Sequence, residues 1–287
     1  MAAAPTGVVR IDPATNLAKT IPFGLTPNTS PLESRAIVAG AGFVWVRDSF
    51  NGQINKIDPR GLSIVGRLGL TGYPASLAAD RNTVWAGFST IDPQTNRITY
   101  RPARGTRCCL DIGLGDGWLW ALPNAGVEQV FPFTGRVRKT FDINGSALAI
   151  GDGNVWVLSR IQSAVTPISE GSAQVGQPIA LGGDPIAIAL GDGALWIADR
   201  AGTVDRIPIN GSGGVESVPV GGDPVDIAFG AGGVWVTNCG NRTVDRIDPL
   251  TRTVQKTIHL PDYPTRLAIG EGAVWVVLDA KPLGGCP

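Results

Sequence analysis

The stretch AGGVWVTNCGNRTVDRIDPLTRTV, residues 231–254, nearly repeats DGALWIADRAGTVDRIPINGSGGV, residues 192–215. Each copy has an apolar run around a tryptophan, Trp196 or Trp235, followed by the segment T-V-D-R-I. Self-similarity at a spacing of about 40 residues is typical of repeat architectures. The fold therefore depends on how many copies the chain holds and how its ends are used.

The same unit runs through the whole sequence. A Val-Trp or Leu-Trp pair occurs seven times, at intervals of 35 to 40 residues. Its tryptophans are Trp45, Trp85, Trp120, Trp156, Trp196, Trp235 and Trp275. A small, apolar run such as AIALGDG precedes each pair, and a segment such as DRIDPLT and a fourth run such as TVQKTIHLP follow it. Four short strands with tight turns account for about 40 residues, the length of one β-propeller blade.

The two ends of the chain complete this pattern. GVVRIDPATNLAKTIPF, residues 7–23, corresponds to the last two strands of a unit, and TRLAIGEGAVWVVLDA, residues 265–280, to the first two. Together, about residues 6–23 and 264–280 make a seventh blade, and closing the ring removes exposed sheet edges. The sequence predicts one all-β domain over residues 1–287, a seven-bladed β-propeller of four-stranded antiparallel blades.

The tryptophans occupy the second strand of each predicted blade. Blades pack face to face, so both faces of this strand are buried, and it is apolar without alternation. We expect the seven indoles to fill the gaps between neighbouring blades as core residues.

Composition excludes some classes of partner. The 287 residues contain 24 basic and 24 acidic side chains, which argues against a general affinity for nucleic acid. No apolar run approaches the ~20 residues that span a bilayer, so no membrane insertion is expected. The first residues, MAAAPTG, have neither a basic n-region nor an apolar h-region and are not an intact signal peptide. We expect a monomer.

Blade topology divides the loops between two faces. The GDG and DPxT turns share one face, where Asp and Gly act as turn formers and supply too few oxygens for calcium. The opposite face carries the loops that enter the first strands. We call the residue nine positions before each repeated tryptophan the register position of its blade. The seven register positions are Ala36, Ser76, Asp111, Ala147, Ala187, Asp226 and Arg266. Four small and three charged residues are not typical of a packed core and indicate the mouth of the central channel.

The charged register positions have two interpretations. Asp226 and Arg266 fall on adjacent blades with Arg35 nearby, so they form either a structural ion pair or a small polar pocket that binds a ligand. The second-to-third strand loops and the loops into the first strands add candidate ligand-binding residues around the rim. With Arg35, Asp111, Asp226 and Arg266, these candidates are Arg47, Asp48, Tyr73, Asp199, Asn238 and Tyr263. Arginines and aromatics suit an anionic or carbohydrate partner, although an ordinary solvated surface has the same composition.

The four cysteines point to disulfides and not to a metal. No C-x-x-C pair is present, so no metal or other cofactor is predicted. Cys239 and Cys286 fall on the same face of adjacent blades, where a disulfide would tie the C-terminal end to the ring. Such a bond implies an oxidising compartment, and hence a secreted or periplasmic protein. The adjacent Cys108 and Cys109 form either a vicinal disulfide or two buried free thiols, and we favour the thiols.

No catalytic residue can be assigned. His259 is the single histidine, expected at the partly exposed end of a fourth strand, and no G-x-S-x-G elbow accompanies it. Asp111 and Asp226 could perform acid–base chemistry across the channel.

The pattern GGDPVDIAFGAGGVWVTNCGNRTVDRIDPLTRTV, residues 221–254, resembles the YVTN-type repeats of bacterial surface and secreted propellers, and also the propellers of the streptogramin B lyase family. The resemblance implies a propeller, and other members of this broad class are binding or sensor modules. The lyase uses histidines and a glutamate with magnesium, a set that this chain does not match.

Two functions remain from the sequence. The favoured one is a secreted or periplasmic binding or sensor module that recognises a small molecule, glycan or protein around the channel mouth. The alternative is a lyase or hydrolase with a carboxylate and arginine site at that mouth.

Overall fold

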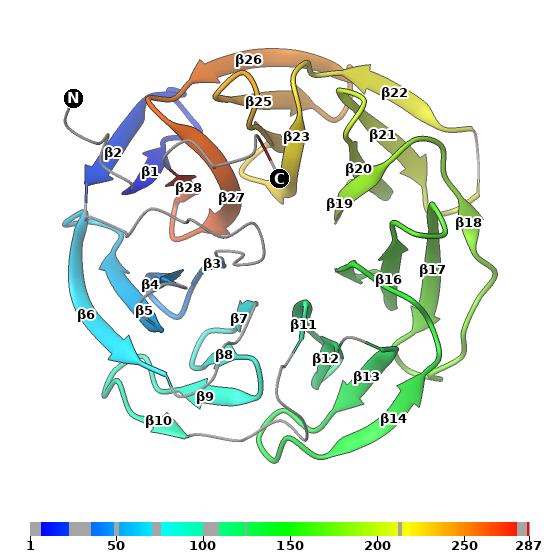
Figure 1. Cartoon of the computed structure of the whole chain (residues 1–287), viewed down its shortest axis with the longest axis horizontal. Helices are drawn as coiled ribbons and strands as arrows, with labels where there is room; N and C mark the ends of the chain where they lie inside the picture. The colour runs from blue at the N-terminus through cyan, green and yellow to red at the C-terminus, as the bar shows by residue number, and fades with distance from the viewer. Residues whose placement is uncertain are drawn as a thin grey trace.

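The computed structural model describes residues 7–22, 36–48, 52–70, 76–99, 109–123, 125–211, 214–279 and 286. These residues form seven four-stranded antiparallel sheets in a ring (Figure 1). The chain is a seven-bladed β-propeller, as predicted. The first strand of a blade lies nearest the centre of the ring and the fourth at its outer edge (Figure 1).

Six blades are contiguous in sequence. Blade 1 contains β3 (Ile37–Gly40), β4 (Phe43–Asp48), β5 (Gln53–Asp58) and β6 (Ser63–Gly69). Blade 2 contains β7 (Leu77–Ala79), β8 (Val84–Ala86), β9 (Ser89–Ile91) and β10 (Ile98–Thr99). Blade 3 contains β11 (Asp111–Gly115), β12 (Trp118–Leu122), β13 (Val127–Val130) and β14 (Val137–Phe141). Blade 4 contains β15 (Ala147–Gly151), β16 (Asn154–Ser159), β17 (Ala164–Ser169) and β18 (Ile179–Ala180). Blade 5 contains β19 (Pro185–Gly191), β20 (Ala194–Asp199), β21 (Thr203–Pro208) and β22 (Glu216–Pro219). Blade 6 contains β23 (Pro224–Gly230), β24 (Gly233–Asn238), β25 (Thr243–Asp248) and β26 (Thr253–His259).

Blade 7 joins strands from the two ends of the chain. It contains β27 (Tyr263–Gly270), β28 (Ala273–Asp279), β1 (Gly7–Ile11) and β2 (Ala18–Pro22), in that spatial order. β1 pairs antiparallel with β28, from Val8 opposite Val277 to Ile11 opposite Val274. The ring therefore closes by pairing the terminal strands, which confirms the predicted closure.

The repeated tryptophans fill the interfaces between blades. All seven are at most 4% exposed. Trp196 of β20 packs in one cluster with Ile227 and Val234 of blade 6, and Trp275 of β28 packs with Val44 of blade 1. In four blades the indole Nε1 donates a hydrogen bond of 3.0–3.2 Å to the carbonyl of the glycine five residues earlier. The predicted core role of these indoles is confirmed.

A cation from the third strand covers the indole in several blades. The Arg246 guanidinium of β25 lies 5.1 Å from the ring of Trp235, and its Nη1 donates a 2.7 Å hydrogen bond to the Pro13 carbonyl in the β1–β2 turn of blade 7. In blade 1 the Lys56 Nζ lies 5.4 Å from the ring of Trp45 and donates to the Pro93 carbonyl of blade 2. The basic residue before the I-D-P segment thus fastens its blade to the turn of the next, a contact that the sequence analysis missed.

Glycines at the ends of the inner strands allow neighbouring blades to approach closely. A Cβ at Gly191, the last residue of β19, would lie 2.0 Å from the Phe229 ring of β23. Gly115 and Gly151 end their inner strands against Ile150 and Leu190 of the next blade in the same way. The first glycine of the G-D-G motif therefore sets the spacing of the strands around the centre.

The DPxT turns are stabilised by their aspartates, as expected for turn formers. Asp12, Asp92 and Asp248 each accept backbone N–H hydrogen bonds of 2.7–3.1 Å from residues two and three positions later. These backbone bonds lower the pKa of Asp12 and Asp92.

In the part of the chain that the structure describes, no helix is long and apolar enough to cross a membrane.

Candidate functional site

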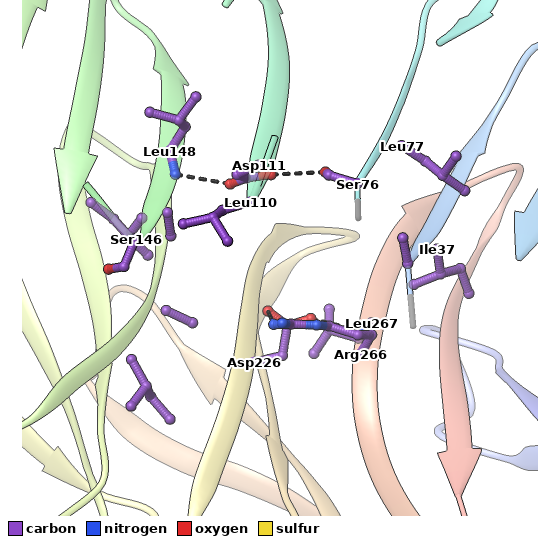
Figure 2. A pocket seen from close by; sticks show the side chains of 15 residues that line it. Ile37, Ser76, Leu77, Leu110, Asp111, Ser146, Leu148, Asp226, Arg266 and Leu267 are labelled. Carbon is purple, nitrogen blue, oxygen red and sulfur yellow. Dashed lines mark hydrogen bonds and ion pairs between the residues drawn. The ribbon is translucent and has the colours of Figure 1, made fainter. Parts of the chain in front are cut away.

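A cavity of about 230 Å³ lies where the inner strands of the seven blades begin (Figure 2). Every blade contributes its register position to the lining: Ala36, Ser76, Asp111, Ala147, Ala187, Asp226 and Arg266. The residues on either side of these positions, including Leu110, Leu148 and Ile186, complete the lining, whose exposed surface is mainly polar. The structure therefore brings together, in one cavity, residues that are 35 to 41 positions apart in sequence.

The Asp111 carboxylate links three blades. Its Oδ1 accepts a 3.0 Å hydrogen bond from Ser76 Oγ of blade 2 and a 2.9 Å bond from the N–H of Ile112. Its Oδ2 accepts a 2.9 Å bond from the N–H of Leu148 in blade 4 (Figure 2). Burial raises the pKa of Asp111, against the lowering effect of these hydrogen bonds and of the Arg266 charge.

Asp226 makes the equivalent link between blades 6 and 7. Its Oδ2 accepts a 2.9 Å hydrogen bond from the N–H of Leu267, and its Oδ1 accepts a 3.1 Å bond from the N–H of Ile227. Burial raises the pKa of Asp226, Arg266 lowers it, and the negative charge of Asp111 raises it further. The Asp226 side chain nevertheless keeps 17% of its surface exposed, so it can be reached from the cavity.

Arg266 is only loosely held. Its Nη1 lies 3.9 Å from Asp226 Oδ1, which is longer than a hydrogen bond, and its side chain is 41% exposed. Figure 2 shows the Asp226 side chain of β23 close to the Arg266 side chain of β27. An ion pair at this distance, with one partner exposed, contributes little to stability.

The two aspartates occur where a main-chain donor needs a partner. The innermost strand of a blade has no further strand on its central side, so N–H groups on that side need another acceptor. Asp111 and Asp226 each accept such an N–H from the next blade, from Leu148 and Leu267 respectively. These bonds fix both carboxylates in position at the cavity wall.

Several predicted rim residues do not line the cavity. Asp199 and Asn238 end the second strands of their blades and are buried, with Asp199 accepting a 2.7 Å bond from the N–H of Ala201. Asn238 donates from Nδ2 to Asp245 Oδ2 at 2.8 Å. Asp199 thus stabilises the turn after its strand, and Asn238 links the second strand of blade 6 to the third.

Three more rim residues also lie away from the cavity lining. Arg47 and Asp48 are buried at the end of β4, 6% and 4% exposed. Tyr263 lies beneath the Arg242 guanidinium, 5.8 Å from its ring centre. The predicted residues Arg35 and Tyr73 lie outside the described residues. Of the ten candidates, the described cavity lining includes Asp111, Asp226 and Arg266.

The cavity also contains residues that the sequence analysis did not single out. Leu110 and Ser146 lie one position before the register and line the wall, and Leu110 is 50% exposed. Ser76 was placed in the register, but its hydrogen bond to Asp111 was not foreseen. The sequence could have indicated Leu110 and Ser146, because the residue before a register position lies at the same end of the strand.

The disulfide predicted between Cys239 and Cys286 is confirmed. The two residues are bonded, with a Cα–Cα distance of 5.7 Å. Cys108 lies outside the described residues. Cys109 is 2% exposed and disulfide-bonded, so the expectation of a free thiol there was wrong. Cys109 immediately precedes Leu110 and Asp111, which places a covalent constraint beside the cavity.

Histidines and clusters of metal-binding side chains are the other groups from which a catalytic centre could be built. His259 is exposed at the end of β26, on the outer edge of blade 6, as expected. No group of three or more His, Cys, Asp or Glu side chains suited to a metal ion is found in the described ranges.

Comparison with known proteins supports the fold and assigns no family. No protein-family model matches the chain, and no curated protein matches it. Among solved structures, the chain is similar to hydrazine synthase from Kuenenia stuttgartiensis, with a TM-score of 0.69 and 11% sequence identity. The alignment covers 90% of this chain and 99% of that chain. At this identity the similarity shows the propeller fold alone.

Proposed function

We propose that this propeller is a secreted or periplasmic binding or sensor module that holds its ligand in the cavity at the channel mouth. The observation that carries the proposal is the meeting of all seven register positions around one cavity, with Asp111, Asp226 and Arg266 in its wall. Concave sites in which a few polar groups are fixed in position are the usual places for small ligands.

The fixed geometry of the carboxylates supports binding. Main-chain donors from neighbouring blades hold both groups before any ligand arrives, so little ordering is required on binding. The Cys239–Cys286 disulfide supports an oxidising location. The similarity of the repeat to YVTN-type and streptogramin B lyase-like propellers is in line with a binding module.

A ligand screen followed by calorimetry tests the proposal. Compounds and glycans that shift the melting temperature of the wild-type protein are titrated against Ala147→Phe, which fills the cavity from β15. The matched control is Ala180→Phe, because Ala180 is an exposed alanine at the outer edge of the same blade. We expect Ala147→Phe to abolish binding and Ala180→Phe to retain it. Ligands that bind both variants equally would place the site elsewhere.

A second candidate function is supported by the raised pKa values of Asp111 and Asp226. Two carboxyl groups that line one cavity, each with a pKa raised by burial, can exchange protons with a substrate, as a lyase or hydrolase requires. Its test is turnover of a compound found in the screen. Loss of turnover with retained binding in Asp111→Asn would favour an enzyme. If no binding compound is turned over, the lyase or hydrolase function is excluded for those compounds.

A further inference from the structure

We infer that the cavity takes a small organic cation, a primary alkylammonium, whose charged end is held by Asp226 and Asp111 and whose alkyl part contacts the exposed Leu110 side chain. The inference rests on the proposed function, since it names the class of ligand for that same site.

The acidic and basic side chains of the described cavity lining do not balance. The described lining contains two carboxylates, Asp111 and Asp226, and one guanidinium, Arg266. The other described lining residues are neutral. With both carboxylates ionised, these groups sum to one negative charge in a site that is partly enclosed by protein. Charge removed from water in this way is costly unless it is compensated.

The Asp226 carboxylate has hydrogen-bond acceptor positions that the protein does not use. An ionised carboxylate offers about four lone-pair positions. Asp111 uses three in bonds to Ser76, Ile112 and Leu148. Asp226 uses two, from Ile227 and Leu267, and Arg266 stays 3.9 Å away. Asp226 can therefore accept N–H donors from a ligand, and Arg266 can swing into solvent when a ligand ammonium replaces it.

An exposed aliphatic side chain, Leu110, favours an organic cation over a metal ion. Calcium takes 6–8 oxygen ligands, and the two carboxylates already give most of their positions to protein donors. Leu110 is 50% exposed beside Asp111, and Ile186 and Leu148 extend the aliphatic surface. A short alkyl chain buries this surface, whereas a hydrated ion leaves it in contact with water.

The electrostatics of the site support this choice. Burial raises the pKa of both aspartates, and the charge of Asp111 raises the pKa of Asp226. A bound ammonium favours the ionised form of each carboxyl group and lowers both pKa values again. Binding should therefore release protons, and it should weaken as the pH falls and the carboxyl groups become protonated. Among the described residues, the charged groups that face each aspartate here are the other aspartate and Arg266.

Titration calorimetry with n-butylammonium chloride, and with sodium butyrate as the oppositely charged probe of the same length, tests the inference. We expect saturable binding of n-butylammonium at pH 7.5 that weakens at pH 5, with protons released to the buffer, and no binding of butyrate. Asp226→Asn should weaken binding roughly 10- to 100-fold, because it removes a hydrogen bond to a charged group. Arg266→Gln should strengthen it roughly two- to fivefold, because the resident cation is lost. Glu216→Gln, an exposed acid 41% accessible in an outer strand, is the matched control and should change nothing.

Three results would overturn the inference. These are the absence of saturable n-butylammonium binding up to about 50 mM, preferential binding of butyrate, or unchanged affinity in both Asp226→Asn and Arg266→Gln. Arg266 is exposed, so Arg266→Gln gives a result even if Asp226→Asn does not fold. If a different compound binds the wild type and is blocked by Ala147→Phe while n-butylammonium does not bind, the proposed function stands and the cation fails. If n-butylammonium binds Ala147→Phe as well as it binds the wild type, both fail.

Discussion

Removing the Cys239–Cys286 disulfide should loosen the closing blade before the rest of the ring. The bond joins the turn after β24 in blade 6 to the segment beyond β28 in blade 7, and it spans 47 residues of sequence. In the chain-entropy description, a crosslink stabilises by about 3 kcal/mol for a 15-residue loop and about 4.7 kcal/mol for a 100-residue loop. A loop of this length corresponds to about 4 kcal/mol.

The expected melting shift follows from the size of the protein. Unfolding entropy of about 2.1 cal/mol/K per residue gives roughly 0.6 kcal/mol/K for 287 residues. The double variant Cys239→Ser/Cys286→Ser should therefore melt about 7 °C below the wild type. The variant isolates this bond, because chemical reduction would also open the disulfide of Cys109. Asn241→Ser, an exposed change in the same turn, is the control.

The location of the effect is the sharper part of this prediction. Hydrogen exchange in the double variant should rise in β27, β28 and β1, which make up the seam of the ring, and stay low in blades 3 and 4. Scanning calorimetry and exchange mass spectrometry measure both parts. A shift under about 2 °C, or faster exchange spread evenly over all blades, would refute the reasoning that the bond protects the seam.

Three other outcomes follow from the structure. Trp235→Ala should cost roughly 3–5 kcal/mol in urea unfolding, because a fully buried indole is lost; a cost equal to that of the partly exposed Trp118→Ala would contradict an interblade role. Arg246→Ala should cost roughly 1.5–3 kcal/mol of unfolding free energy, because the bonds to Pro13 and Asn16 are lost. Replacing the exposed Arg252 by Ala should cost under about 1 kcal/mol. Equal costs would show that the Arg246 contact does not fasten blade 6 to blade 7. For Asp226, whose folded pKa is raised, the contribution to stability is present below its ordinary pKa of 3.8 and is lost as the pH rises through the folded value. Asp226→Asn should therefore gain stability relative to the wild type between pH 4 and pH 7, and a relative loss over that range in urea titrations would show that the sign is wrong.

The ring could be predicted from the sequence because its determinants are local. Each tryptophan occupies the same position of a strand that is buried on both faces, so its spacing counts the blades directly. The terminal segments could be assigned to one blade because each lacks the strands that the other supplies. The register positions followed from the same spacing, since nine residues before each tryptophan is one level of the ring.

The details of the site depend on contacts that spacing does not encode. Asp199 and Asn238 have the residue types of a binding rim, but in the structure Asp199 accepts a hydrogen bond from the turn after its strand and Asn238 donates one to Asp245 of the third strand. The Asp111 link to Leu148 depends on a main-chain N–H of the next blade, which has no signature in the side-chain sequence. The Arg246 contact with Pro13 joins residues 233 positions apart across the closing seam. Such contacts become visible only once the blades are placed side by side.

A crystal structure with n-butylammonium, or with another compound that the screen identifies, tests the central claim most directly. The claim is that the seven register positions enclose a binding site. The account predicts ligand density inside the cavity, within hydrogen-bond distance of an Asp226 carboxylate oxygen and against Leu110. Density at another surface, with the cavity free of the compound that binds in solution, would contradict it.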